Sequence, residues 1–166
     1  GRVDESGVRI DELDAIDFAR VQRVVLLACG SSYHAGLVGK HVIEQWVRVP
    51  AETLIGSEFR YASSVIDENT LAILITQSGE TADTLAAQRE LKEKGARNIA
   101  ICNVVGSMVT READGVLYTH AGPEIGVAAT KSFTTQLTCL YLLALYLAEA
   151  RQTLTQEQVQ NYIEDL

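Results

Sequence analysis

The sequence predicts an α/β domain, a three-layer sandwich in which a parallel sheet lies between two layers of helices. Two continuous apolar runs, residues 24–28 and 71–76, are typical of strands buried on both faces. Helical patterns alternate with these and three further strands, which indicates βαβ units. Loops rich in glycine, serine and threonine follow three strands, and ligands of such sheets bind at the carboxyl ends of the strands.

The first half of the chain begins with a polar, acidic segment, residues 1–21, whose loose helical spacing predicts a linker or a leading helix. Pro50 stands near the start of the second strand and places that strand toward an edge of the sheet. The elements expected after the first segment are, in order, a strand over 24–28, a helix over 33–47, a strand over 49–54 and a short helix over 56–64.

The second half repeats the alternation of strand and helix. Gly95 is well placed to end the helix that follows the second buried strand. The expected elements are a strand over 71–76, a helix to about residue 94, a strand over 98–102, a short helix over 107–113, a strand over 115–120 and a long helix to about residue 149. We therefore expect a main domain over 22–150 and a polar helical tail over 151–166, which needs something to pack on.

Composition excludes several classes of function. The 166 residues are 47% hydrophobic and 22% charged, as in an ordinary globular domain. The net charge of −8 argues against a nucleic-acid partner, which needs a basic face. A nest of backbone N–H groups can still bind a phosphate in an acidic protein. The apolar stretch 137–148 is too short to span a bilayer and predicts a buried helix, so we expect no membrane partner.

The cysteines and histidines do not form a metal-binding pattern. Cys29, Cys102 and Cys139 are widely spaced and no CxxC pair occurs, so we interpret them as reduced residues of a cytoplasmic protein without a signal peptide. His34 and His41 lie seven residues apart on one predicted helix, about two turns, which is too far to chelate one ion readily. We expect neither a metal nor a cofactor.

The loop that follows the second buried strand, residues 76–81, reads TQSGET. Ser78 stands where the N-cap of the next helix is expected, and Thr81 follows three residues later. A helix N-terminus has unpaired N–H groups and a positive dipole end, and the hydroxyls of Thr76, Ser78 and Thr81 add donors for a phosphate. An ordinary helix cap would explain the same residues. Glu80 is unfavourable beside a phosphate unless its side chain points away.

Two other loops extend this pattern. Residues 29–32, CGSS, repeat the design after the first strand, although a plain strand-to-helix turn would look the same. Neither loop has the Walker lysine spacing or GxGxxG, so nucleotide binding fits poorly. In the third loop, over 121–131, Glu124 could contact sugar hydroxyls or a neighbouring chain, or it could be a solvated side chain. Lys131 could pair with an anion, or it could be solvated.

Three motifs, LACGSSYHAG, TQSGETADTL and AGPEIGVAATKSFTTQL, together resemble the SIS (sugar isomerase) domain family over about residues 22–150. The likeness is greatest to the first of two SIS domains in the glutamine–fructose-6-phosphate aminotransferases (isomerising), or glucosamine-6-phosphate synthases. The resemblance implies a flavodoxin-like, five-stranded parallel sheet. It also implies a site for fructose 6-phosphate or glucosamine 6-phosphate, with the phosphate on Ser32, Thr76, Gln77, Ser78 and Thr81, the sugar along Val127 and Ala129, and Glu124 close by.

The sequence departs from the family pattern at three places. Ser31 stands where threonine is usual and Thr76 where serine is usual, and both keep a hydroxyl. Ala129 stands where serine is common, which removes one hydroxyl near the sugar. These residues hold neither a second SIS repeat nor a glutaminase domain that begins with cysteine. The resemblance therefore implies the first half of an isomerase module, with those two domains as partners and no catalytic residue of its own.

Two other functions remain open at this point. One is a free-standing SIS module that binds or senses sugar phosphates. The other is a small sugar-phosphate isomerase that is complete only as an oligomer, with acid and base contributed across an interface. Whichever function the chain has, the apolar stretch 137–148 leads us to expect self-association, most simply a homodimer.

Overall fold

The structure is a computed structural model that describes the chain except for residues 1, 5, 6, 15, 60, 62–64, 127 and 128. Its main sheet consists of β3 (Arg23–Ala28), β4 (Ala51–Ile55), β5 (Thr70–Thr76), β6 (Arg97–Cys102) and β7 (Gly115–Tyr118). The strands lie in the order β4–β3–β5–β6–β7, and every neighbouring pair is parallel. The predicted five-stranded parallel sheet is confirmed, with the Pro50 strand at an edge.

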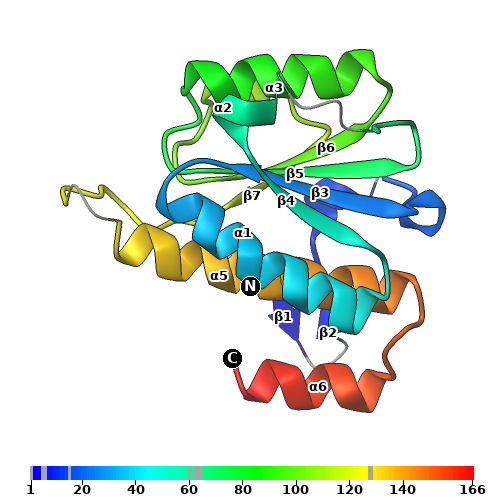
Figure 1. The fold of residues 1–166 in the computed structure, drawn as a ribbon. Helices are drawn as coiled ribbons and strands as arrows, with labels where there is room; N and C mark the ends of the chain where they lie inside the picture. The colour runs from blue at the N-terminus through cyan, green and yellow to red at the C-terminus, as the bar shows by residue number, and fades with distance from the viewer. Residues whose placement is uncertain (1, 5–6, 15, 60, 62–64, 127–128) are drawn as a thin grey trace.

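Helices cover both faces of this sheet, as Figure 1 shows. One face carries α1 (Ser31–Val42) and α5 (Lys131–Ala150), and the other carries α2 (Gly56–Phe59), α3 (Ala82–Glu93) and α4 (Met108–Glu112). Successive strand residues point to opposite faces, so they enter two separate cores. Leu26 and Ile73 pack on the α1–α5 side, whereas Leu27 and Leu74 pack on the α3 side. The two continuous apolar runs are explained by this double burial.

The end of α3 follows the expected capping chemistry. Gly95 has a positive φ of 87° just beyond the helix. Its N–H donates to the carbonyl of Lys92, and the N–H of Ala96 donates to the carbonyl of Leu91. This pair of bonds is the Schellman motif, which satisfies carbonyls that a helix end leaves open. The predicted role of Gly95 is confirmed.

The first segment of the chain differs from the expectation. Instead of a linker or a leading helix over 1–21, its described residues form β1 (Val3–Asp4), β2 (Gly7–Val8) and the 3₁₀ turns η1 (Asp11–Leu13) and η2 (Phe18–Arg20). Ile10 and Leu13 are fully buried in the core on the α1–α5 side. Elements this short show neither a helical nor a strand period in the sequence, which is why the pattern predicted a loose helix.

The tail forms the predicted helix, α6 (Gln156–Glu164). Thr155 and Gln158 make a reciprocal capping box that fixes its start. α6 packs against β2, and the Tyr162 ring lies 4.4 Å from the Trp46 ring between centroids. Figure 1 shows α6 with β1 and β2 as a further layer outside α1 and α5. The tail therefore packs on this chain's own first segment and on the π turn η3 (Ile43–Val47) that extends α1.

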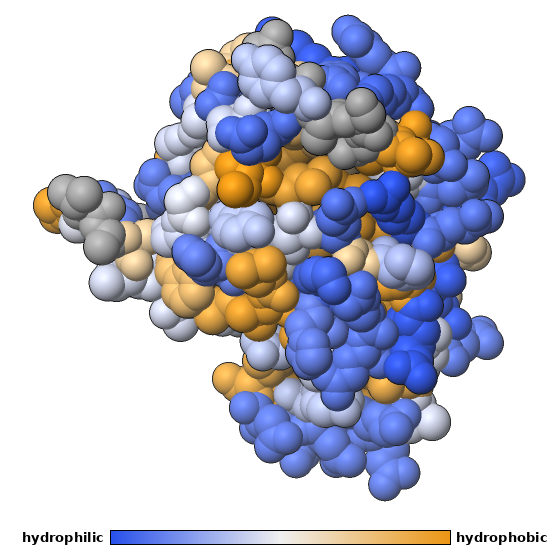
Figure 2. Space-filling model, in the orientation of Figure 1, coloured by the Kyte–Doolittle hydropathy of each residue, from blue (hydrophilic) through white to orange (hydrophobic). Residues whose placement is uncertain are grey.

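The apolar helix α5 is a core element. In the part of the chain that the structure describes, it alone has the length and composition of a membrane-crossing helix. Its Leu140, Leu143 and Leu147 are nevertheless buried in the core on the α1–α5 side of the sheet. On the face of the molecule in Figure 2, hydrophobic residues gather in separate patches among hydrophilic ones. The expectation of a homodimer took 137–148 as an exposed apolar face, but the fold buries residues 139, 140, 143–145, 147 and 148 of this stretch. The stretch is therefore largely a core element, and the homodimer stays a prediction.

Candidate functional site

A cavity of about 410 Å³ lies at the carboxyl ends of β3 and β5. Counted along the chain, the strand order of the sheet is 2-1-3-4-5, and the connections leave β3 and β5 in opposite directions. This point, where the order reverses, is the usual ligand position in a flavodoxin-like sheet. Seven of the eight predicted site residues line the cavity, namely Ser32, Thr76, Gln77, Ser78, Thr81, Glu124 and Ala129. Val127 lies outside the described residues.

A second cavity, of about 450 Å³, lies near the amino ends of β5 and β6. Its arginines already have acidic partners, because Arg20 pairs with Asp17 at 3.2 Å and Arg97 with Asp114 at 3.5 Å. No glycine-bearing loop at the carboxyl end of a strand reaches it. We therefore take the cavity at the carboxyl ends of β3 and β5, here called the switch-point cavity, as the candidate site.

The N-terminus of α1 points into the switch-point cavity. Gly30 precedes the helix with φ 59° and ψ −135°, a backbone conformation that disfavours residues with a Cβ, and nothing lies within 4 Å of the position where a Cβ would stand. Ser31 and Ser32 form the first turn, and no side chain caps it. Unpaired N–H groups and the positive end of the helix dipole at such a position favour an anion.

The β5–α3 loop brings a second helix N-terminus to the same cavity. Ser78 is not the N-cap that the sequence predicted, because α3 begins at Ala82 and Thr81 is the N-cap, without a side-chain capping bond. The Thr76 hydroxyl accepts the Gly79 N–H at 3.1 Å, and the Ser78 hydroxyl accepts the Glu80 N–H at 3.3 Å. These bonds use lone pairs of the oxygens and leave both hydroxyl protons for a ligand.

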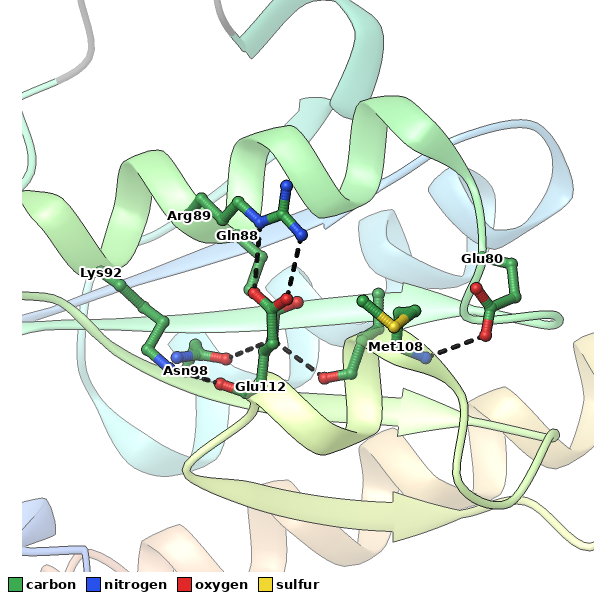
Figure 3. A network of polar contacts seen from close by, with 8 residues as sticks. Glu80, Gln88, Arg89, Lys92, Asn98, Met108 and Glu112 are labelled. Carbon is green, nitrogen blue, oxygen red and sulfur yellow. Dashed lines mark hydrogen bonds and ion pairs between the residues drawn. The ribbon is translucent and has the colours of Figure 1, made fainter.

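The Glu80 side chain points toward Met108, as Figure 3 shows, and Glu80 is not among the described residues that line the switch-point cavity. Its carboxylate accepts the N–H of Met108 at 2.9 Å, at the first turn of α4. The carbonyl of Gly79 accepts the N–H of Val109 at 3.1 Å. These two hydrogen bonds fix the β5–α3 loop to the start of α4. The carboxylate of Glu80, which would be unfavourable beside a phosphate, therefore has a structural role in the loop.

A buried network in turn holds α4 (Figure 3). The Gln88 amide donates at 2.9 Å both to the Asn98 side chain and to the carbonyl of Val109, and both amide side chains are fully buried. Arg89 pairs with Glu112 at the far end of α4 at 3.1 Å. Because the network joins α3, β6 and α4, the loop rests on rigid elements of the fold.

Glu124 caps the N-terminus of α5. Its carboxylate accepts the N–H groups of Thr130 and Ser132 at 3.2 and 3.1 Å and the Ser132 hydroxyl at 2.9 Å. These bonds, with the one to the Ser132 N–H first among them, hold the pKa of Glu124 below its usual value. The carboxylate lies on the cavity wall but is already occupied, so it is weakly basic.

This capping makes the stability of the α5 N-terminus depend on pH. Because the folded-state pKa of Glu124 lies below its usual 4.5, its contribution is present above that value and is lost as the pH falls through the lowered pKa. Glu124→Gln should therefore lower the free energy of unfolding at pH 7, and the difference from the parent should shrink toward pH 3. Urea unfolding at several pH values measures this, and a difference independent of pH would contradict it.

Two residues of the cavity wall and one residue behind it were not predicted from the sequence. Thr84 is buried on its wall, three residues after Thr81, and this same-face spacing on α3 was the available signal. Ser132 lines the wall beneath Glu124. Gln136 donates to the Ser32 hydroxyl at 3.0 Å from 104 positions away, which no local pattern reveals.

The cysteines and histidines have other surroundings. All three cysteines are free thiols. Cys102 and Cys139 are buried, and burial raises the pKa of Cys139 to about 11, whereas Cys29 is half-buried and lines the switch-point cavity. Within the described ranges no three potential ligands of the His, Cys, Asp and Glu types gather around a metal position.

Comparison with known proteins finds a match between residues 17–146 and the family model described as SIS domain. A glutamine–fructose-6-phosphate aminotransferase (isomerizing) of Clostridium tetani is 54% identical over 155 residues, which are 93% of this chain and 26% of that protein. Its counterpart in Streptomyces coelicolor is 49% identical over 169 residues, covering 100% of this chain and 28% of that protein. The chain thus spans about a quarter of the length of these relatives.

A solved structure gives the same alignment in space. The C-terminal domain of glucosamine-fructose-6-phosphate aminotransferase from Francisella tularensis superposes with a TM-score of 0.92 and 39% identity. The match covers 99% of this chain and 46% of that one. The chain therefore corresponds, in sequence and in fold, to a part of the isomerase region of such enzymes.

Proposed function

The chain belongs to the SIS domain family, and we propose that it is the sugar-phosphate-binding part of the isomerase module of a glutamine–fructose-6-phosphate aminotransferase. The identity of about half with two such enzymes supports this assignment. The second SIS domain of that module and the glutaminase domain of the same enzyme are then the partners of this chain.

The proposed ligand is fructose 6-phosphate or the product glucosamine 6-phosphate. One observation carries the proposal: α1 and α3 begin without side-chain caps at one cavity, and hydroxyls from both loops line it. A phosphate there accepts from the free N–H groups and from Ser32, Ser78 and Thr81. A cavity of about 410 Å³ lies within the range of small-molecule sites. Ala129 lines the same cavity and faces the sugar without a hydroxyl.

We expect the chain by itself to bind but not to catalyse. Making glucosamine 6-phosphate requires ammonia to replace the ketose oxygen and a proton to move between C1 and C2 through a placed base. Of the acids in and beside the described cavity, Glu80 is bonded to Met108 and Glu124 caps α5. His120 lines a neighbouring cavity with Gln77, not the switch-point cavity. The base and the ring-opening group therefore come from the partner domain.

Calorimetry and a product assay test the proposal together. The chain should bind fructose 6-phosphate and glucosamine 6-phosphate. Fructose should bind at least tenfold more weakly because most of the contacts are to the phosphate and each hydrogen bond contributes about 1–1.5 kcal/mol. No glucosamine 6-phosphate should form with glutamine or ammonia. Equal binding of fructose and its phosphate would refute the phosphate site. Product formation that Glu124→Gln abolishes would instead support a complete small isomerase.

A further inference from the structure

A buried amide lies directly behind one hydroxyl of the switch-point cavity. Gln136, on the second turn of α5, is 2% exposed, and Ser32, on the first turn of α1, is 7% exposed. The Gln136 Nε2 donates to the Ser32 Oγ at 3.0 Å. Ser32 lines the cavity, whereas Gln136 does not reach its surface. Within the described part of the chain, Gln136 is linked to the wall of this cavity by its hydrogen bond to Ser32.

The direction of this hydrogen bond determines what Ser32 can offer. A serine hydroxyl has one proton and two acceptor lone pairs. Because Gln136 is the donor, it occupies a lone pair and leaves the Ser32 proton free to point into the cavity. A phosphate group accepts hydrogen bonds, so it needs that proton. With the amide reversed, its oxygen would take the proton and Ser32 would present only lone pairs.

The amide oxygen of Gln136 supports a functional reason for the hydrogen bond between Gln136 and Ser32. The Gln136 Oε1 is buried and has no hydrogen-bond partner. Buried polar atoms without partners are uncommon, and each destabilises the fold. An apolar side chain of similar volume would avoid this at position 136, which lies in the α1–α5 layer beside Cys139 and Leu140. Packing alone therefore does not explain a glutamine here.

We propose that Gln136 is a positioning residue that holds the Ser32 hydroxyl as a donor to the phosphate of the bound sugar. The proposal rests on the proposed function, because it needs a phosphate in the switch-point cavity. Beyond that function, it assigns a role to Gln136, which does not touch the ligand but sets the direction of the hydrogen bond between Ser32 and the phosphate.

A double-mutant cycle tests the route through Ser32. Fructose 6-phosphate affinity is measured by calorimetry for the parent chain, Gln136→Leu, Ser32→Ala and the double variant. Loss of one hydrogen bond to a charged group should make Ser32→Ala bind about tenfold more weakly, and Gln136→Leu should lose about threefold or more. The double variant should bind like Ser32→Ala alone, because Gln136 acts through Ser32. Multiplicative losses in the double variant would overturn the proposal.

The phosphate signal gives a second readout that a purely structural role would not move. Hydrogen-bond donation favours the dianion and lowers the pKa of the bound phosphate, so losing a donor raises it. A pH titration of the ³¹P signal of bound fructose 6-phosphate should show this rise in both Gln136→Leu and Ser32→Ala. Thr134→Ala, which removes an exposed hydroxyl of α5, is the matched control and should leave it unchanged. An unchanged phosphate pKa in Gln136→Leu would contradict the inference.

Stability separates a positioning role from a packing role. Removing the unpartnered Oε1 should leave Gln136→Leu at least as stable as the parent in urea unfolding, while its affinity falls. Gln136→Met provides the same comparison if the branched side chain does not fit. A loss of stability in parallel with affinity in both variants would assign Gln136 to packing. If the parent chain binds no sugar phosphate, the proposed function fails. If it binds and the affinity losses of Gln136→Leu and Ser32→Ala multiply in the double variant, only this inference fails.

Discussion

Removing the hydroxyls of Ser78 and Thr81 together should weaken fructose 6-phosphate binding roughly 30- to 150-fold, about 2–3 kcal/mol at 1–1.5 kcal/mol for each hydrogen bond. Both residues line the switch-point cavity, one on each side of the turn that Gly79 makes into α3. The Ser78 proton is not used within the loop, and the Thr81 side chain makes no capping bond. The alanine variants therefore lose ligand contacts while α3 keeps its own bonds.

The control is a pair of hydroxyls that lie outside the cavity. Thr134 and Thr138 are exposed on α5, and each donates to a backbone carbonyl one turn back. Thr134→Ala/Thr138→Ala removes the same number of hydroxyls and should leave affinity unchanged within calorimetric error. If the Ser78→Ala/Thr81→Ala chain binds fructose 6-phosphate as tightly as the parent, the phosphate lies elsewhere. Equal losses in both pairs would point to a general effect on the fold.

The sheet and the position of the candidate site were predictable because their signals are local. A strand buried on both faces must be apolar along its buried part, and β3 is apolar over residues 24–28 and β5 over residues 71–75. Parallel strands bring their carboxyl ends to one edge, so loops 29–32 and 76–81 had to meet. Neither argument requires knowledge of how side chains pack.

The features that the sequence did not reveal depend on long-range packing or on the details of a turn. Ile10 and Leu13 are core residues only because β7 and α5 lie beside the first segment. Ser78 looks like an N-cap, but the loop adds one more turn, held by the bond from the Gly79 N–H to Thr76, before α3 starts. The bond between Gln136 and Ser32 joins two helices far apart in sequence.

The largest effect on stability is expected from Gly79→Ala. Gly79 has φ +70°, where a side chain costs about 1–2 kcal/mol. A Cβ there would lie 2.1 Å from the Ser107 Oγ and 2.9 Å from the Cys102 Sγ. Overpacking of this kind adds about 1–3 kcal/mol, so urea unfolding should show a loss of roughly 2–5 kcal/mol. The loop can relieve the clash only by moving Thr76 and Ser78, so phosphate affinity should fall as well.

Gly106→Ala separates the two causes of this loss. Gly106 has φ +73°, nearly the same backbone conformation, but nothing lies within 4 Å of its Cβ position. The Gly106→Ala chain should therefore lose only the free energy of unfolding that comes from backbone strain, about 1–2 kcal/mol, and should keep its affinity for fructose 6-phosphate. Ser107→Gly removes the nearest clashing atoms, so in the Gly79→Ala chain it should restore part of the lost stability and affinity, with the Cys102 contact remaining. Equal losses in Gly79→Ala and Gly106→Ala, with no recovery on Ser107→Gly, would show that the close contact between the β5–α3 loop and the start of α4 does not set the position of this loop.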